Sequence, residues 1–218
     1  MIKTVIFDMD GVIVDTEPVH KYAYFKHFEE LGIDVTPELY ATFTGNSTKN
    51  VYQKIKNLFG VEGEVNDLVL RKRAIFNDAF DTKPNLELIS GVENLIKDLH
   101  KNGLELILAS SASKSTIERV FRRFSLDQYF SHKVSGEDFP KSKPDPSIFL
   151  HAASLSKNAK DECIIIEDST SGVKAANAAE IFCVGYHSKN SKLQNLDGAN
   201  MTINDFSEIN AEIVKKLN

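Results

Sequence analysis

Two aspartates stand two residues apart near the beginning of the chain, where an apolar run ends. The run ends at Phe7 and is followed by Asp8, Met9, Asp10 and Gly11. A short apolar run that stops at polar residues is typical of a buried strand of a parallel sheet, and ligands of such sheets bind beyond the carboxyl ends of the strands. Two carboxylates there repel each other unless a cation lies between them, and Mg²⁺ takes carboxylate oxygens. The alternative is an ordinary Asp-Gly turn, because both residue types are common in turns.

Three more polar clusters follow apolar runs or precede predicted helices. Ser110 and Ser111 follow one apolar run, Lys143 precedes a predicted helix, and Glu167 and Asp168 follow another apolar run. A hydroxyl beside backbone N–H groups at the start of a helix binds phosphate oxygens. Pro144 and Pro146 follow Lys143 and stiffen the chain there, so the lysine would be held in place. A second pair of acids indicates metal ligation.

Each of these clusters also has a simpler explanation. Ser113 is a candidate N-cap of the helix that follows it, and Asp168 or Ser169 is a candidate N-cap of a later helix. A lone loop lysine such as Lys143 is usually solvated. Judged one at a time, the clusters leave a structural role and a chemical role open.

From Gly91 onward, strands and helices alternate along the chain. The apolar spacing predicts strands near residues 104–109, 132–134, 163–166, 181–184 and 201–203, separated by helices near 92–101, 114–124, 146–155 and 171–179. Such alternation predicts an α/β fold with a doubly wound parallel sheet. Because parallel strands bring their carboxyl ends to one edge, the four polar clusters should converge there.

Residues 16–84 differ in character and contain no strand-like alternation. Apolar residues at helical spacing predict helices near 19–31, 51–58 and 64–80, and the segment 83–85 is a candidate return linker. We therefore expect two domains. One is an α/β core of residues 1–15 and 85–218, and the other is an inserted α-helical cap of residues 16–84.

The converging side chains would form a site for phosphoryl transfer. That reaction needs a nucleophile in line with the leaving oxygen, together with a metal ion and fixed cations that neutralise the phosphoryl oxygens. Two pairs of acids, a hydroxyl and a lysine at one sheet edge supply these parts.

The four motifs, in this order and over essentially the whole chain, resemble those of the haloacid dehalogenase superfamily. The helical insertion resembles the small cap of its β-phosphoglucomutase-like subfamily. The resemblance implies that Asp8 is a nucleophile that forms an aspartyl-phosphate, and that Asp10 acts as general acid and then as general base. Dehalogenases of the superfamily share only the first aspartate of this motif and use no metal, so Asp10 argues against dehalogenation.

The same resemblance implies a Mg²⁺ site and a phosphate site. Asp8, the backbone carbonyl of Asp10, and Asp168 would hold the metal, and Glu167 would belong to the metal shell as a supporting group. The phosphoryl oxygens would be bound by Ser110, Ser111 and Lys143.

Cap residues are expected to select the substrate. By resemblance, His20 matches a cap histidine, and Thr48 occupies the position of a cap-loop arginine. A cap lysine falls near Arg73, with Arg71 and Lys72 close by. Lys49 is next to Thr48, and Tyr24 replaces a tryptophan of the mutases. A role on the helix surface is the alternative for His20. A mutase must bind the distal phosphate of a bisphosphate intermediate at a strongly cationic site, whereas a phosphatase need only admit water. Thr48 therefore favours a phosphatase, although Arg73 and Lys49 could compensate.

The overall composition argues against several other classes of protein. The chain of 218 residues has a net charge of −5, which argues against a nucleic-acid binder, and its apolar runs are too short to span a bilayer. No hydrophobic leader precedes the first apolar run, so the cytoplasm is the default expectation. The sequence identifies no apolar patch for a dimer, so a monomer is the default expectation.

These observations together predict an enzyme. We expect a Mg²⁺-dependent phosphohydrolase that acts on a small phosphorylated metabolite such as a sugar phosphate, through an aspartyl-phosphate. The alternative is a β-phosphoglucomutase or a related phosphosugar mutase. A non-catalytic phospho-receiver domain is more remote, because receivers lack a second aspartate two residues after the first and have no helical cap.

Overall fold

The computed structural model describes residues 1–43, 46–82, 86–189 and 194–217. The chain divides into two compact units, one formed by Met1–Asp15 with Glu87–Asn218 and the other by Thr16–Leu86. The predicted linker 83–85 lies outside the described residues. No helix within the described ranges is both long and apolar enough to cross a membrane.

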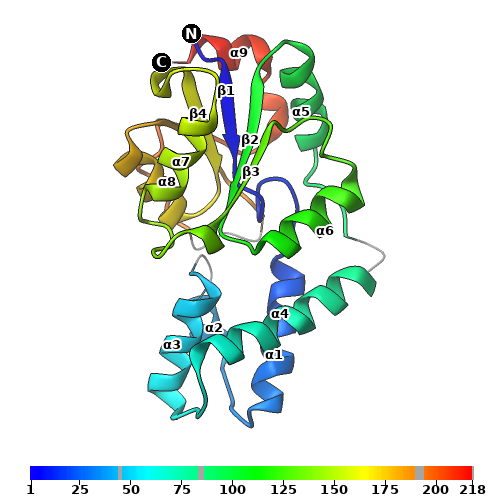
Figure 1. Cartoon of the computed structure of the whole chain (residues 1–218), viewed down its shortest axis with the longest axis vertical. Coiled ribbons are helices and arrows are strands. Elements are labelled where there is room, and N and C mark those ends of the chain that lie inside the picture. Colours follow the sequence, from blue (N-terminus) through cyan, green and yellow to red (C-terminus); the bar gives the residue numbers. More distant parts are fainter. Residues whose placement is uncertain (44–45, 83–85, 190–193, 218) are drawn as a thin grey trace. The chain divides into compact units, whose positions relative to one another are not determined.

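A six-stranded sheet forms the centre of the larger unit, with the strand order β3-β2-β1-β4-β5-β6 (Figure 1). Every neighbouring pair of strands is parallel. The strands are β1 (Thr4–Phe7), β2 (Glu105–Ser110), β3 (His132–Ser135), β4 (Cys163–Glu167), β5 (Phe182–Tyr186) and β6 (Met201–Ile203). The order reverses at β1, which lies between β2 and β4, and ligands of α/β sheets bind at such a reversal. The predicted doubly wound α/β core is confirmed.

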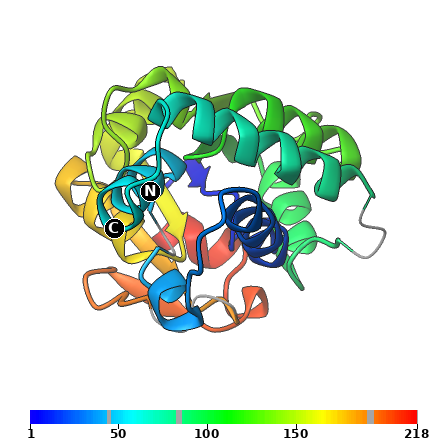
Figure 2. The same cartoon turned by 90° about the horizontal axis from the view of Figure 1, so that it is seen from below.

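Helices cover both faces of this sheet (Figures 1 and 2). They are α5 (Val92–Lys101), α6 (Lys114–Phe124), α7 (Ser147–Leu155), α8 (Thr170–Ala179) and α9 (Ala211–Lys216), with short 3-10 turns η1 (Gly136–Asp138), η2 (Lys160–Glu162) and η3 (Phe206–Glu208). On one face, Ile6 and Ile165 pack with Phe149 of α7 in a buried cluster. Side chains of a strand alternate between faces, so Phe7 points to the other face, where its ring lies 5.8 Å from that of Phe130.

The predicted helices of this unit agree closely with the observed ones. The helices predicted at 92–101 and 114–124 have the observed bounds of α5 and α6. Helix α7 begins one residue later than predicted, because Pro146 occupies the N-cap position and Asp145 Oδ1 accepts from the backbone N–H of Ser147 at 3.0 Å.

The smaller unit is helical, and its described part contains α1 (Glu17–Glu30), α2 (Pro37–Ala41), α3 (Thr48–Phe59) and α4 (Val65–Thr82). Its core includes the buried rings of Tyr24, Phe28, Tyr40, Phe43 and Tyr52. Helix α2 was not predicted because it is only five residues long, too short for helical periodicity. Its signal is the N-cap, where Thr36 Oγ1 accepts from the backbone N–H of Leu39 at 3.2 Å.

A buried histidine joins two helices of the smaller unit. His27 Nδ1 lies 2.6 Å from the hydroxyl of Tyr52, and His27 is 3% exposed. Burial lowers the pKa of His27, and the Arg71 guanidinium acts in the same direction while the Glu30 carboxylate opposes it. Those two charges form a bidentate pair, with Arg71 Nε 2.7 Å from Glu30 Oε2. The core of this unit therefore favours neutral His27.

This buried histidine makes stability depend on pH. A lowered folded-state pKa stabilises the protein above the ordinary histidine value of about 6.5, and that stability is lost as the pH falls through the lowered value. Wild type should lose more free energy of unfolding between pH 8 and pH 5 than the variant His27→Gln, which keeps a polar partner for Tyr52 but does not titrate. Urea unfolding followed by circular dichroism measures this difference. Parallel pH curves for the two proteins would contradict the prediction.

Candidate active site

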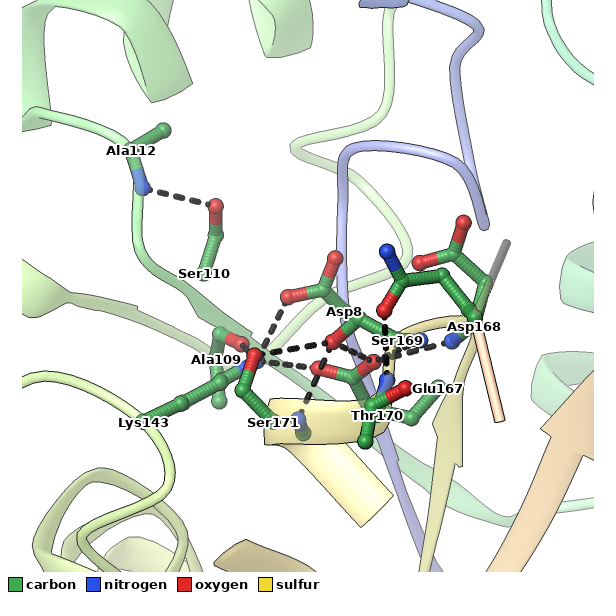
Figure 3. Close-up of polar contacts among 12 residues, drawn as sticks. Asp8, Ala109, Ser110, Ala112, Lys143, Glu167, Asp168, Ser169, Thr170 and Ser171 are labelled. Carbon is green, nitrogen blue, oxygen red and sulfur yellow. Dashed lines mark hydrogen bonds and ion pairs between the residues drawn. The ribbon is translucent and has the colours of Figure 1, made fainter. Parts of the chain in front are cut away.

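One buried ammonium group joins three strands at the carboxyl edge of the sheet. Lys143 Nζ lies 2.6 Å from Asp8 Oδ1, 2.7 Å from Glu167 Oε1 and 3.2 Å from the carbonyl oxygen of Ala109 (Figure 3). These partners stand at the ends of β1, β4 and β2. The ring of Phe149 packs beneath the ammonium, with its centroid 4.5 Å from Nζ. Lys143 is therefore held in the site and is not a solvated loop lysine.

Asp8 and Lys143 have pKa values far from their ordinary ones, because the two groups are buried and their charges interact. Burial raises the pKa of Asp8 to about 7, the carboxylates of Glu167 and Asp10 act in the same direction, and the Lys143 ammonium opposes them. Burial lowers the pKa of Lys143, but Asp8 and Glu167 outweigh it and hold this pKa above its usual range. The site contains more carboxylates than its one lysine can balance, so an additional cation would favour the ionised form of Asp8.

Both carboxylate oxygens of Glu167 have partners within the protein. Oε1 accepts from Lys143, and Oε2 accepts from the backbone N–H groups of Asp168 and Ser169 at 2.9 and 2.8 Å. The carboxylate lies against the first turn of α8, where a Cβ on Gly172 would come within 1.8 Å of Glu167 Oε1. Glu167 was predicted to belong to the metal shell. These contacts favour the supporting role, in which it orients Lys143 and Asp168.

A tight turn after β1 brings Asp168 against the first motif. The backbone N–H of Gly11 donates to the carbonyl of Val14 at 2.9 Å, and the N–H of Val14 donates to the carbonyl of Met9 at 3.1 Å. Gly11 has a φ of +85°, and a Cβ on it would lie 2.0 Å from Asp168 Oδ2. The Asp168 carboxylate thus lies beside the backbone that follows Asp10.

Asp8, the carbonyl of Asp10, and Asp168 are the groups here that could hold Mg²⁺. Among the described residues, no three His, Cys, Asp or Glu side chains form a ready-made metal cluster. A set of two carboxylates and a carbonyl is compatible with that finding, because Mg²⁺ is usually held by one or two carboxylates and keeps several waters. The oxygen-only donors and the surplus of negative charge fit this ion.

Of two consecutive serines at the end of β2, the first is buried and the second is exposed. Ser110 is fully buried, and its Oγ accepts from the backbone N–H of Ala112 at 3.0 Å, which leaves its O–H proton available to an acceptor. Ser111 is exposed. Ser113 Oγ accepts from the backbone N–H of Thr116 at 3.2 Å, so the N-cap role considered for Ser113 is confirmed.

Residues at the end of β3 and directly after it support this loop, although no sequence motif identified them. Ser135 Oγ donates to the carbonyl of Ala112 at 2.7 Å. Glu137 Oε2 accepts from the backbone N–H of Lys114 at 2.9 Å. Gly136 lies so close to the loop that a Cβ on it would be 3.0 Å from Ser111 Cα.

In the helical unit, the cation next to His20 is Lys72. Its Nζ lies 2.6 Å from His20 Nδ1 and 4.3 Å from the ring centroid of Tyr24, and Lys72 is 1% exposed. His20 stacks on Phe76 with the ring centroids 4.3 Å apart, so it has contacts beyond a helix surface. Arg73, predicted for this position, is the next residue along α4. Helical spacing could have identified Lys72, because it lies four residues from Phe76 on the buried face.

The other cap candidates lie at the start of α3. Burial raises the pKa of Tyr24, and the side chain of Thr48 acts in the opposite direction. Lys49 is exposed.

Residues 5–186 match the family model described as haloacid dehalogenase-like hydrolase. The chain belongs to this family. It is therefore an enzyme of the haloacid dehalogenase type, a phosphatase or a β-phosphoglucomutase. The family is generally Mg²⁺-dependent.

The chain is similar both to a β-phosphoglucomutase and to a phosphatase. It is 28% identical to the β-phosphoglucomutase of Bacillus subtilis (strain 168), over 97% of this chain and 93% of that protein. It is 29% identical to the phosphorylated carbohydrates phosphatase of Thermotoga maritima, over 82% of each chain. The crystal structure of β-phosphoglucomutase from Clostridium difficile superposes with a TM-score of 0.86 at 27% identity, over 99% of this chain and 96% of that one. Protein SUPPRESSOR OF QUENCHING 1 of Arabidopsis thaliana is 30% identical over 84% of this chain, which spans only 18% of that protein.

The contact between Gly11 and Asp168 can be tested with a matched pair of glycines. Gly11→Ala should lower kcat/KM about 100-fold, because the added Cβ displaces the Asp168 carboxylate. Gly103→Ala is the control. Gly103 has a φ of +79°, and a methyl group added there would meet no atom within 4 Å, so this variant incurs only the backbone strain. Steady-state kinetics on the two variants measures the difference. Equal activity in both would show that the space at Gly11 is not needed.

Proposed function

We propose that this chain is a Mg²⁺-dependent phosphohydrolase that acts on a small phosphorylated metabolite, a sugar phosphate, through an aspartyl-phosphate. The observation that supports it best is the contact of Lys143 Nζ with Asp8 Oδ1 at 2.6 Å. A cation in contact with a buried carboxylate at a sheet reversal can bind a phosphoryl oxygen next to the nucleophile. The same cation helps to keep that nucleophile ionised.

In the proposed reaction, a carboxylate oxygen of Asp8 attacks phosphorus as the bond from phosphorus to the leaving oxygen breaks. Asp10 gives a proton to the leaving oxygen and later takes one from the water that hydrolyses the aspartyl-phosphate. Lys143 and the Ser110 hydroxyl bind phosphoryl oxygens during both steps. Bound Mg²⁺ would supply further positive charge to these oxygens.

Two residues of the helical unit bear on the choice between a phosphatase and a mutase. Thr48 is neutral, which supports a phosphatase, because a threonine has no guanidinium to hold a second phosphate. Lys72 supports the second candidate, a phosphosugar mutase, because a buried ammonium could bind a distal phosphate. We place the phosphatase first because hydrolysis requires only that water reach the aspartyl-phosphate.

The decisive assay is product analysis with Mg²⁺ present across a panel of phosphosugars that includes β-glucose 1-phosphate. Wild type should release inorganic phosphate, and Asp8→Asn should release none, since an amide cannot act as the nucleophile. A coupled assay for glucose 6-phosphate runs in parallel. Glucose 6-phosphate formed without free phosphate would replace the phosphatase with the mutase, and phosphate release that persists in Asp8→Asn would remove Asp8 from the mechanism.

The cap cation can be tested by comparing two neighbouring residues. Lys72→Met keeps most of the apolar side chain and removes the charge. It should lower kcat/KM about 10- to 100-fold, the value of one charged hydrogen bond to substrate. Arg73→Met removes one charge from the same helix turn and should change kcat/KM less. Circular dichroism melting of both variants checks that the helical unit stays folded. A larger effect at Arg73 would restore that residue as the cap cation.

A further inference from the structure

The first turn of α8, which carries the backbone next to Asp168, is held from two directions. Within its own segment, Glu167 Oε2 accepts from the backbone N–H of Ser169 at 2.8 Å. From the segment after β5, Gln194 Oε1 accepts from the backbone N–H of Thr170 at 2.8 Å. Thr170 is the first residue of α8, so its N–H is one of those that a helix leaves without an intrahelical acceptor.

Thr170 also accepts a hydrogen bond from the same segment. Its Oγ1 accepts from the backbone N–H of Asn195 at 2.7 Å. Two hydrogen bonds of opposite direction, the Thr170 clasp, therefore join α8 to residues 194–195. Figure 3 shows Thr170 directly beside Asp168 and Ser169.

The segment that forms the clasp is fixed along α8. Leu196 is 4% exposed and belongs to the same buried cluster as Val173. The carbonyl of Gly198 accepts from Asn177 Nδ2 at 2.9 Å, and a Cβ on Gly198 would lie 2.7 Å from that nitrogen. The segment thus follows α8 from its first residue to Asn177 and has little room to move away.

The far end of this segment is anchored to the sheet. Asn200 Oδ1 accepts from the backbone N–H of Cys183 at 2.8 Å, and the backbone N–H of Asn200 donates to the carbonyl of Cys183 at 2.9 Å. Cys183 belongs to β5, the strand beside β4. The clasp therefore connects the first turn of α8 to β5, whereas Glu167 connects it to the end of β4.

We propose that Gln194 and Thr170 are positioning residues for the metal site. The clasp holds the first turn of α8, and with it Asp168, where the carboxylate can complete a Mg²⁺ site with Asp8. Mg²⁺ requires near-ideal octahedral geometry at about 2.0–2.1 Å, so a small displacement of one carboxylate weakens binding. Groups that orient a metal ligand from outside the ligand shell affect affinity for this reason. The inference rests on the proposed role of Asp168 as a Mg²⁺ ligand.

The test measures Mg²⁺ affinity by isothermal titration calorimetry, with no substrate present. Gln194→Met has nearly the same length but no acceptor, and it should weaken Mg²⁺ binding about tenfold, the lower end of the range for groups that orient a ligand. Gln194→Glu keeps an acceptor oxygen and should bind at least as tightly as wild type. Thr170→Val should weaken binding in the same way, and Thr170→Ser should restore it.

Two controls separate the possible failures. If wild type binds no Mg²⁺, or if Asp168→Asn binds it as tightly as wild type, the proposed metal site fails and the inference fails with it. If Asp168→Asn weakens binding while Gln194→Met and Thr170→Val match wild type, the metal site stands and the positioning role is overturned. Urea unfolding of each variant completes the test. Loss of stability at unchanged Mg²⁺ affinity would make the clasp a helix cap only, which also overturns the proposal.

Discussion

The organisation of the α/β unit depends on one buried cation shared by two carboxylates. Asp8 and Glu167 both contact Lys143 Nζ, and all three side chains are almost fully buried. The ammonium opposes the effect of burial and of the Glu167 carboxylate, both of which raise the pKa of Asp8 and so disfavour its ionised form. The strand order follows the same requirement. Only a strand between β2 and β4 can place its terminal carboxylate within reach of a lysine that also contacts the ends of both neighbours.

Two glycines without side chains let the carboxylates of the site pack closely against the backbone. Gly11 and Gly172 each leave a position where a methyl group would overlap a carboxylate, that of Asp168 in one case and that of Glu167 in the other. The two glycines act differently on the backbone. Gly11 also adopts a positive φ, which L-residues rarely adopt, whereas Gly172 lies in a helix, where alanine would normally be preferred. We therefore attribute the glycine at position 172 to the close packing of the Glu167 carboxylate against α8.

The core of the site could be predicted from the sequence because each of its motifs directly follows or precedes a regular element. Parallel topology then brings Asp8, Lys143 and Asp168 to one edge without any knowledge of side-chain contacts. The same argument fails for Gln194, because it lies in a long connection where no periodicity fixes its position. Lys72 was not chosen as the cap cation for another reason. The motif pattern favoured its neighbour Arg73, whereas the buried face of α4 is decided by packing against His20 and Phe76.

The contact between Lys72 and His20 also fixes the chemistry that the helical unit offers. An ammonium group can only donate, so His20 Nδ1, 2.6 Å from Lys72 Nζ, must accept, and the proton of the neutral ring is then on Nε2. The ammonium of Lys72 therefore carries the positive charge of this pair, whereas neutral His20 contributes a donor at Nε2 and has its Nδ1 acceptor occupied by Lys72. Under the proposed function, we expect these donors to favour ligands rich in oxygen acceptors, as phosphorylated sugars are. The sheet edge would then supply the reaction, and the donors of α1 and α4 would supply a preference among substrates.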